Sequence, residues 1–165
     1  MKFSFLSICI ALTVFTSCEK EYPVNPCDCY IITEFTFGHF YGECGGEGCV
    51  EIFRVDLDQQ KLFEDVNDFY PRTDTLYQGN FEMELSDDKY QQVKDLLAFV
   101  PSDLYIETQT VLGQPDAGDW GGIYFEMEMA DGRKFWLLDQ MDNNMPQAYN
   151  EFVDKINEKI SVIHE

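Results

Sequence analysis

The pair Asp131-Gly132 constrains the fold of this chain more than any other short stretch. It separates two segments in which apolar and polar residues alternate, Ile123–Met129 and Arg133–Leu138. An Asp-Gly pair tolerates the positive backbone φ angles that a two-residue turn between antiparallel strands requires. Residues 123–138 are therefore predicted to form a β-hairpin, and an antiparallel sheet is the starting point for the fold.

Several earlier segments have the composition of further strands. Residues 29–38 are rich in β-branched and aromatic side chains. Three more segments extend the pattern into a meander: Cys49–Asp56, Lys61–Val66 and Leu76–Leu85. In the last of these, apolar residues alternate with glutamates, so we expect one face of the sheet to be buried and the other to be acidic. Residues 104–112 are a further strand candidate.

Two segments have the pattern of helices. Ser86 is suited to an N-cap, because its hydroxyl can accept a hydrogen bond from a backbone N–H of the first turn. An apolar stripe follows it, and Pro101 predicts that this helix ends at about Val100. A second helix is predicted to begin near Pro146, where proline is favoured. Its apolar stripe consists of Tyr149, Phe152, Val153, Ile156, Ile160 and Ile163.

The order of these elements predicts an α+β fold. Strands are followed by a helix, then by more strands and a last helix. The expected architecture is an antiparallel β-sheet, built from a meander and a hairpin, with two helices packed on one face. We expect residues 27–165 to form a single domain, because a chain of this length suits one hydrophobic core.

The N-terminus has the pattern of an export signal. An uncharged, apolar run follows Lys2, and it ends in Phe15-Thr16-Ser17-Cys18, which resembles the lipobox of bacterial lipoproteins. We expect residues 1–17 to be a signal peptide that is removed, and Cys18 to carry a diacylglycerol and an amine-linked chain such as palmitate. Residues 18–26 would then be a short tether to a membrane of the cell envelope. We expect the outer membrane, with the periplasmic and the surface side both left open. A plain cleaved signal is the alternative.

Four cysteines remain after the predicted lipid site: Cys27, Cys29, Cys44 and Cys49. An even number in an exported chain is typical of disulfides. Cys27 and Cys29 are too close to pair with each other, so each is expected to pair with one of Cys44 and Cys49, in an order left open. A zinc site built from the same four residues is the alternative, although structural zinc sites more often use C-x₂-C pairs.

The charge of the chain limits its partners. It contains 31 acidic and 11 basic residues, for a net charge of −20. Such a surface repels phosphate backbones, which argues against nucleic-acid binding. Hydrophobic residues make up 45% of the chain, which argues against disorder. Cations and basic protein surfaces remain as possible ligands.

The sequence names no catalytic residue, metal ligand or cofactor. No serine lies in a G-x-S-x-G motif, and Ser86 is explained as a helix cap. The two histidines are His39, which is typical of an aromatic strand end, and His164, the penultimate residue, which we expect to be frayed. They lack the spacing of a zinc pair, so a zinc hydrolase is unsupported.

Two loops are rich in oxygen ligands, residues 116–119 and residues 139–144. Calcium prefers six to eight such ligands, which makes both loops candidates for a calcium site. Neither has the spacing of a calcium-binding loop motif, and Asp and Asn in loops usually stabilise turns. Trp120, beside the first loop, is either an aromatic binding platform or, more commonly, part of the core.

The stretch Tyr41-Gly42-Glu43-Cys44, leading into Val50–Phe53, resembles a family of small bacterial lipoproteins and secreted domains of unknown function. In that family such a segment opens a meander that is followed by a helix, a hairpin and a C-terminal helix. The family usually has Pro-x-Tyr after the cysteine, where this chain has Gly45–Gly48 and Cys49. The resemblance implies a fold and no activity, so no functional residue is carried over.

These observations favour a lipid-anchored protein of the cell envelope that is a non-enzymatic binding or accessory domain, with a protein partner. One alternative is an inhibitor that presents an acidic loop to a basic enzyme such as a lysozyme. Another is a carbohydrate-active enzyme, which would need two facing carboxylates in a cleft. The oligomeric state is left open.

Overall fold

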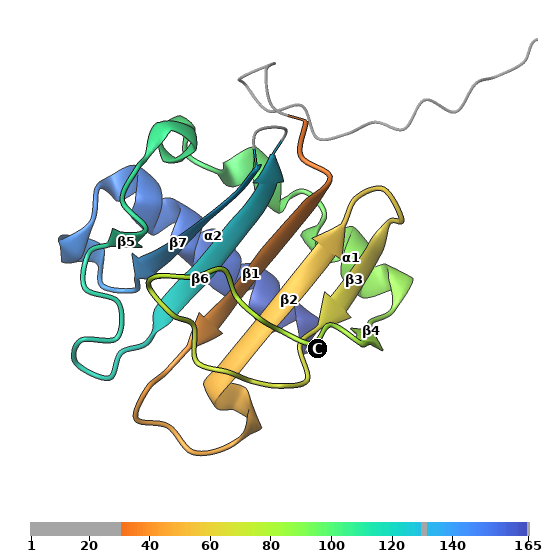
Figure 1. Ribbon diagram of the computed structural model, residues 1–165, viewed down its shortest axis with the longest axis horizontal. Coiled ribbons are helices and arrows are strands. Elements are labelled where there is room, and N and C mark those ends of the chain that lie inside the picture. Colours follow the sequence, from red (N-terminus) through yellow and green to blue (C-terminus); the bar gives the residue numbers. More distant parts are fainter. Residues whose placement is uncertain (1–30, 130–131, 165) are drawn as a thin grey trace, which may run out of the picture.

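The computed structural model describes residues 31–129 and 132–164 (Figure 1). In this part of the chain a seven-stranded sheet has the order β4-β3-β2-β1-β6-β7-β5. All neighbouring strands are antiparallel except β5 and β7. The strands are β1 (Glu34–Phe40), β2 (Val50–Asp56), β3 (Lys61–Glu64), β4 (Met83–Glu84), β5 (Val111–Leu112), β6 (Gly122–Met129) and β7 (Gly132–Asp139).

The predicted hairpin is confirmed. β6 and β7 pair along their whole length, from Met129 opposite Gly132 to Gly122 opposite Asp139. The central strand is β1, which pairs with β2 on one side and with β6 on the other. Gly38 permits the close approach of β2, because a Cβ atom there would lie 2.0 Å from the carbonyl oxygen of Glu51.

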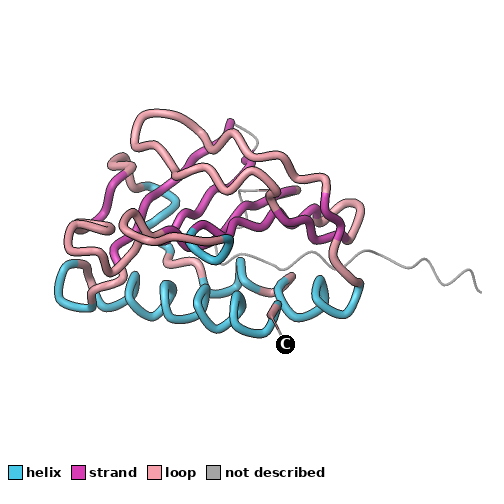
Figure 2. The backbone as a smooth tube through the Cα atoms, turned by 90° about the horizontal axis from the view of Figure 1, so that it is seen from below, coloured by secondary structure: helices cyan, strands magenta, loops and turns pink. Residues whose placement is uncertain are grey.

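The helices lie together on one face of the sheet (Figure 2). They are α1 (Asp87–Val93) and α2 (Gln147–Ile163). Short 3-10 helices lie in the connections: η1 (Glu47–Cys49), η2 (Leu96–Phe99), η3 (Ser102–Ile106) and η4 (Asp142–Asn144). All six residues of the predicted apolar stripe of α2 are buried. Packed against α1 and the strands, they close a large core. The α+β fold with two α-helices on one face is confirmed.

The predicted first helix is too long. Ser86 is its N-cap, as expected, and accepts a hydrogen bond from the N–H of Lys89. However, α1 ends at Val93, and the chain turns before η2, in which Leu96 and Leu97 are both buried. The change to a tighter helix reorients the chain, so that these two neighbouring leucines both reach the core.

Two predicted strands are mostly wrong. Residues 104–112 contain η3 and only the two-residue strand β5, because Leu104 and Tyr105 are both buried. Adjacent side chains can share one core in a helical turn, whereas a strand would direct them to opposite faces. Residues 76–85 contribute only β4, since Tyr77 and Phe81 leave the sheet to cover its other face.

The second face of the sheet is covered by a single loop. This loop, residues 65–82, connects β3 to β4 and is called the strap below; it crosses the face opposite the helices (Figures 1 and 2). Tyr77 and Phe81 of the strap pack with a small apolar cluster on the sheet. The buried sheet members of this cluster are Phe40, Val50, Ile52, Tyr124 and Leu137. The expectation of a solvated acidic face is therefore wrong where the strap covers the sheet.

The predicted disulfide pairing is wrong. Cys44 is bonded to Cys49, with 5.5 Å between their Cα atoms. The glycines between them let the chain fold back within five residues, and Gly46 has a φ of 136°, a conformation that side chains disfavour. This bond leaves neither residue for Cys27 or Cys29, which lie outside the described residues, as does Cys18.

Candidate functional site

Asp65 holds the two ends of the strap together. Its side chain is only 3% exposed and accepts hydrogen bonds from the N–H groups of Asp68 and Asn80 and from the hydroxyl of Tyr77, the last at 2.6 Å. The N–H of Val66 also donates to the carbonyl of Asn80 at 3.0 Å. A buried carboxylate with several donors fixes the geometry of what it joins. The strap is consequently a closed loop rather than a free one.

Tyrosines fasten the middle of the strap to the sheet. The N–H of Tyr77 donates to the hydroxyl of Tyr124 at 2.9 Å, and that hydroxyl donates to Glu126. The two rings are in contact, with 5.5 Å between their centroids. Burial, together with Asp65 beside Tyr77 and Glu126 beside Tyr124, raises the pKa of both hydroxyls well above the usual range. Both hydroxyls are therefore held in the protonated form that can donate to a carboxylate.

Asp116 anchors the outer part of the strap. Its carboxylate accepts hydrogen bonds from the hydroxyl of Tyr70 at 2.9 Å, from the N–H of Gly42 at 2.6 Å and from the N–H of Gly121 at 3.0 Å. The ring of Tyr70 also meets Phe40 edge-on, at 5.0 Å between centroids. Burial and the bond to Asp116 raise the pKa of Tyr70 to about 12. One carboxylate thus joins the strap to two other loops at the same end of the sheet.

This scaffold displays two large aromatic side chains to solvent. Phe69 is 57% exposed and Tyr70 is 48% exposed. They follow Asp68, whose φ of 52° helps to bring the chain over the sheet. Beside them lies a pocket of about 200 Å³, lined by Phe69, Tyr70, Arg72, Thr75, Leu76, Tyr77 and Gln78. We call Phe69, Tyr70 and this pocket the aromatic surface, and it is the candidate functional site.

An ionic cluster occupies the part of the same sheet face that lies toward the β6–β7 turn. Arg133 donates to Glu126 at 2.8 Å and to Glu34 and Glu128 at 2.7 Å each. Arg54 stacks on Phe81 of the strap, with its guanidinium carbon 3.9 Å from the ring centroid. A glycosidase needs one carboxyl that carries a proton beside one that does not. Here one cation, Arg133 of β7, binds three carboxylates of β1 and β6, and this arrangement ties the three strands together.

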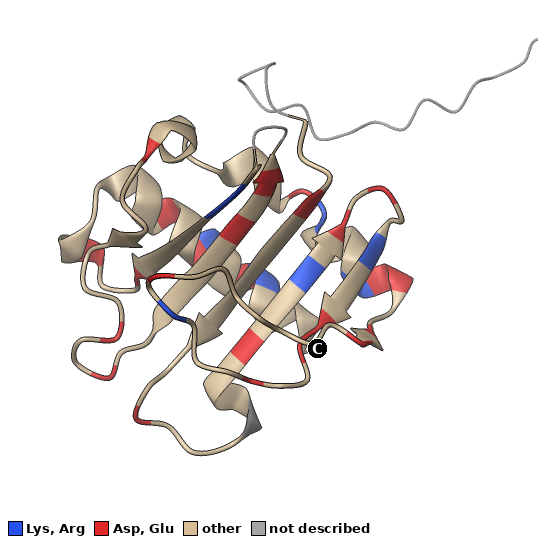
Figure 3. Cartoon of the chain, in the orientation of Figure 1, with Lys and Arg blue, Asp and Glu red and all other residues tan. Residues whose placement is uncertain are grey.

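Most basic side chains are occupied within the protein. Those paired with carboxylates are Arg54, Lys61, Arg72, Arg133, Lys155 and Lys159. Lys89 and Lys134 donate to the carbonyls of Ile163 and Tyr105. Acidic residues are far more numerous than basic ones on the strands and loops drawn in Figure 3. The charge that the chain displays is therefore mostly negative.

Each of the two loops that were candidates for calcium uses one carboxylate internally, Asp116 in the first and Asp139 in the second. Asp139 is fully buried and accepts hydrogen bonds from Gln114 N, Trp120 Nε1, Met141 N and Asn144 Nδ2. Burial alone would raise its pKa, but these donors hold it below the usual range. Asp116 is engaged as described above. Within residues 31–129 and 132–164, no group of three or more His, Cys, Asp and Glu side chains is arranged to hold a metal ion.

Trp120 is not one of the buried core residues. Its indole N–H donates to Asp139 at 2.9 Å, and its ring lies over Gly118, where a Cβ atom would come within 2.1 Å of the ring. The side chain is half-buried and packs inside its own loop. It contributes to the rigidity of the loop that carries Asp116.

The two histidines converge on one carboxylate. His39 and His164 each place Nε2 at 2.9 Å from the same oxygen of Glu51, although the His39 contact is poorly aligned for a hydrogen bond. His164 also contacts the ring of Phe53, so the expectation of a frayed residue is wrong. Burial lowers the pKa of His39, against the opposing attraction of Glu51. This cluster joins the end of α2 to the sheet.

Sequence reasoning missed Asp65, Phe69 and Tyr70. Phe69 and Tyr70 stand in a segment without periodicity, whereas Asp65 lies in the predicted strand Lys61–Val66, beyond the end of β3 at Glu64. The roles of Asp65 and Tyr70 depend on partners elsewhere in the chain. The length of the segment was the available indication, because loops longer than about 12 residues inside a compact domain are usually functional.

Comparison with known proteins adds no assignment. No protein-family model matches the chain. No curated protein and no solved structure matches it either. No helix of the described residues is long and apolar enough to cross a membrane.

Proposed function

We propose that this chain is a lipid-anchored binding domain of the bacterial cell envelope, and that its aromatic surface recognises a basic protein. The observation that carries the proposal is the exposure of Phe69 and Tyr70 on a strap that is held in place by Asp65 and Asp116. Aromatic side chains on a rigid support lose little conformational entropy on binding, which is why they dominate interface energies.

The charge of the chain indicates the chemistry of the partner. The net charge is −20, and the basic side chains that could offset it near the surface are mostly engaged in internal pairs. A field of this sign attracts basic proteins and accelerates their association. If the basic partner is an enzyme, such as a lysozyme, the bound domain would act as its inhibitor.

Support for the anchor comes from the sequence around Cys18. A lipid on this residue and a tether of a few residues would hold the aromatic surface close to the membrane. Intact mass of the protein from its native membrane tests this: we expect residues 18–165 plus acyl chains. The control is Cys18→Ser, which should keep the unmodified signal peptide. An unlipidated wild-type mass would contradict the anchor.

Binding to a lysozyme, used as a basic probe, tests the recognition surface. We expect affinity to fall steeply as ionic strength rises from about 0.05 to about 0.5 M, because exposed charges are then screened. Phe69→Ala and Tyr70→Ala should each weaken binding by about tenfold or more. The matched control is Phe99→Ala, since Phe99 is 43% exposed on the helix side. An equal loss in the control, or salt-independent binding, would contradict the proposal.

A further inference from the structure

The outer edge of β7 is paired along only part of its length. β5 pairs with Leu137 and Leu138, and the N–H of Leu137 donates to the carbonyl of Thr110 at 2.7 Å. Toward the hairpin turn, Gly132–Trp136 has no further strand on this side among the described residues. The sheet therefore ends in an open backbone edge.

The backbone groups of Arg133 and Phe135 point outward at this edge. Consecutive residues of an antiparallel strand direct their N–H and C=O groups to opposite sides. Because Leu137 directs its N–H away from β6, toward Thr110, Phe135 and Arg133 do the same. In residues 31–129 and 132–164, no backbone partner outside the strands is present for either of them. The backbone N–H and C=O groups of Lys134 and Trp136 point toward β6 instead.

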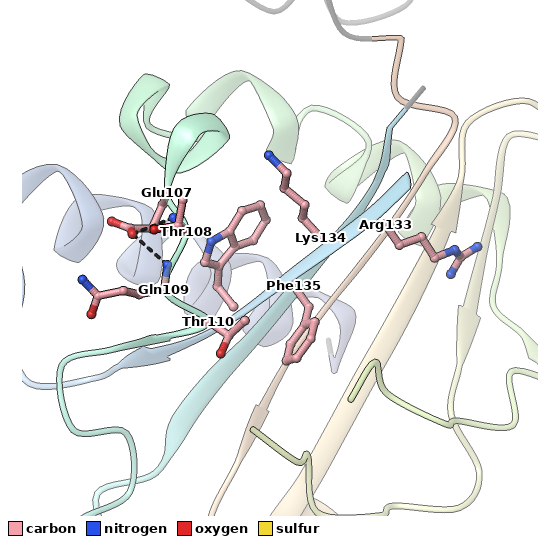
Figure 4. A pocket seen from close by; sticks show the side chains of 8 residues that line it. Glu107, Thr108, Gln109, Thr110, Arg133, Lys134 and Phe135 are labelled. Atoms are coloured by element: carbon pink, nitrogen blue, oxygen red, sulfur yellow. Dashed lines mark hydrogen bonds between the residues drawn. The ribbon is translucent and has the colours of Figure 1, made fainter. Parts of the chain in front are cut away.

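A groove of about 320 Å³ runs beside the open edge. Glu107–Thr110 line it on one side and Arg133–Trp136 on the other (Figure 4). The carboxylate of Glu107 accepts hydrogen bonds from the N–H groups of Thr108 and Gln109, at 2.7 and 2.8 Å. These bonds turn the segment away from β7. The groove lies where a longer β5 would otherwise continue along β7.

The charged side chains at this edge are held by other partners. Lysine and arginine at a sheet edge usually discourage the addition of another strand. Here Arg133 is bound to its three glutamates, and Nζ of Lys134 donates to the carbonyl of Tyr105 at 3.1 Å. Figure 4 shows the two side chains pointing to different sides of β7. The edge between them is left accessible.

We infer that the outer edge of β7 binds a short extended segment of a basic protein partner, which adds to the sheet as a further strand. Five residues, Gly132–Trp136, offer an edge of about 16 Å, enough for a segment of four or five residues. Main-chain hydrogen bonds to Arg133 and Phe135 would supply affinity, and alternate side chains of the segment would contact the half-buried Phe135. The groove is lined by one carboxylate, Glu107, and by two cations, Arg133 and Lys134, which are bound to other groups of the protein. The net charge of −20 of the chain as a whole favours a basic segment.

This edge is separate from the aromatic surface, so the experiments on the edge test the inference without testing the proposed function. Its first test is amide hydrogen exchange of the full-length protein. In the free protein, Arg133 and Phe135 should exchange faster than Lys134 and Trp136. The peptide acetyl-Lys-Val-Lys-Val-Lys-amide, used as the probe, should slow exchange of the first pair and leave the second pair unchanged. No protection, or protection of residues 66–78 instead, would overturn the inference.

A second test separates backbone pairing from side-chain contact. The same peptide, N-methylated at alternate residues, keeps its side chains but loses its backbone donors along one edge. Its affinity should fall by about tenfold or more. In the protein, Phe135→Pro removes the outward N–H and should abolish protection, whereas Phe135→Ala keeps it. Equal binding of the methylated peptide would refute strand addition. Protection that grows with protein concentration, without peptide, would assign the edge to a second copy of this chain and refute the peptide assignment.

Discussion

The helix-covered face of the sheet carries Phe37, Phe53 and Phe125, whereas the strap-covered face carries Phe40, Ile52 and Tyr124. Both sets are buried, but they are covered by different means. On the first face, α2 brings a continuous apolar stripe that packs directly on the strands. On the second, few apolar contacts are available, and buried carboxylates hold an irregular loop in place. The covering of the first face is stabilised by buried apolar surface area, and that of the second by a few hydrogen bonds.

Truncation on the helix-covered face should have the largest effect on stability. Phe152 is 1% exposed and meets Phe125 edge-on at 4.8 Å. Phe152→Ala should lower the free energy of unfolding by about 3–5 kcal/mol, because it removes buried area and leaves a cavity. Urea denaturation measures this, with the exposed Phe99→Ala as the control. A change below about 1 kcal/mol would contradict the importance we give to this face.

Loss of the Asp65 carboxylate should be smaller and more local. Asp65→Ala leaves one buried and two partly buried donors without their acceptor, at a cost of about 1–3 kcal/mol. Hydrogen exchange should show faster exchange in residues 66–80 and unchanged protection in α2. Asp119→Asn, at an exposed turn position with a φ of 61°, is the control. Equal loss of protection in α2 would mean that the two faces unfold together.

The link between Tyr70 and Asp116 should contribute less and should depend on alkaline pH. Since the pKa of Tyr70 is raised to about 12 from 10.0, the stability that it contributes is complete below pH 10 and is lost as pH rises toward 12. Tyr70→Phe should cost about 0.5–1.5 kcal/mol at neutral pH and should remove this part of the alkaline transition. Ultraviolet titration of tyrosinate and denaturation at several pH values measure both effects. A normal titration of Tyr70 near pH 10 would refute the link.

The smallest effect is expected at His39. Burial lowers its pKa below 6.5. The contribution of His39 to the free energy of unfolding is therefore present above pH 6.5 and declines as the pH falls through the lowered pKa. The groups that face it are Glu51 and His164, and Glu64 lies near both of them. NMR titration should find that His39 protonates at lower pH than a free histidine. Glu51→Gln should lower the pKa of His39 further, because the attraction of the Glu51 carboxylate is lost. An unchanged pKa would show that Glu51 does not attract the His39 imidazolium.

The difference between the faces also explains what could be predicted from the sequence. The hairpin and α2 have local periodic patterns, Asp131-Gly132 and the stripe from Tyr149 to Ile163, and the structure confirms both. Most of the strap has no such pattern, and the alternation in residues 76–85 wrongly predicted a strand there. The strap is instead held by Asp65 and Asp116, whose partners are brought near by the fold. The segment 104–112 was mistaken for a strand since buried neighbours such as Leu104 and Tyr105 look alike in a strand and in a 3-10 turn.

The disulfide pairing also could not be predicted from the sequence, although its two cysteines are only five residues apart. The even number of cysteines correctly indicated oxidation, but the partner of Cys44 depends on backbone geometry at Gly46. The candidate site was missed for a related reason. Exposed aromatic residues such as Phe69 and Tyr70 are recognisable as a surface only when the loop beneath them is known to be fixed.

The central position of β1 has a consequence for the order of events during synthesis. Its neighbour β2 follows immediately in the chain, but its other neighbour, β6, comes only after the strap, α1 and the 3-10 turns in the sequence. A chain that is made from its N-terminus therefore completes β1, β2 and β3 while one side of β1 still lacks its partner strand. Contacts between distant segments make folding slow, and unpaired strands are prone to aggregate. The nascent chain consequently has its most vulnerable interval before the C-terminal hairpin arrives and pairs with β1.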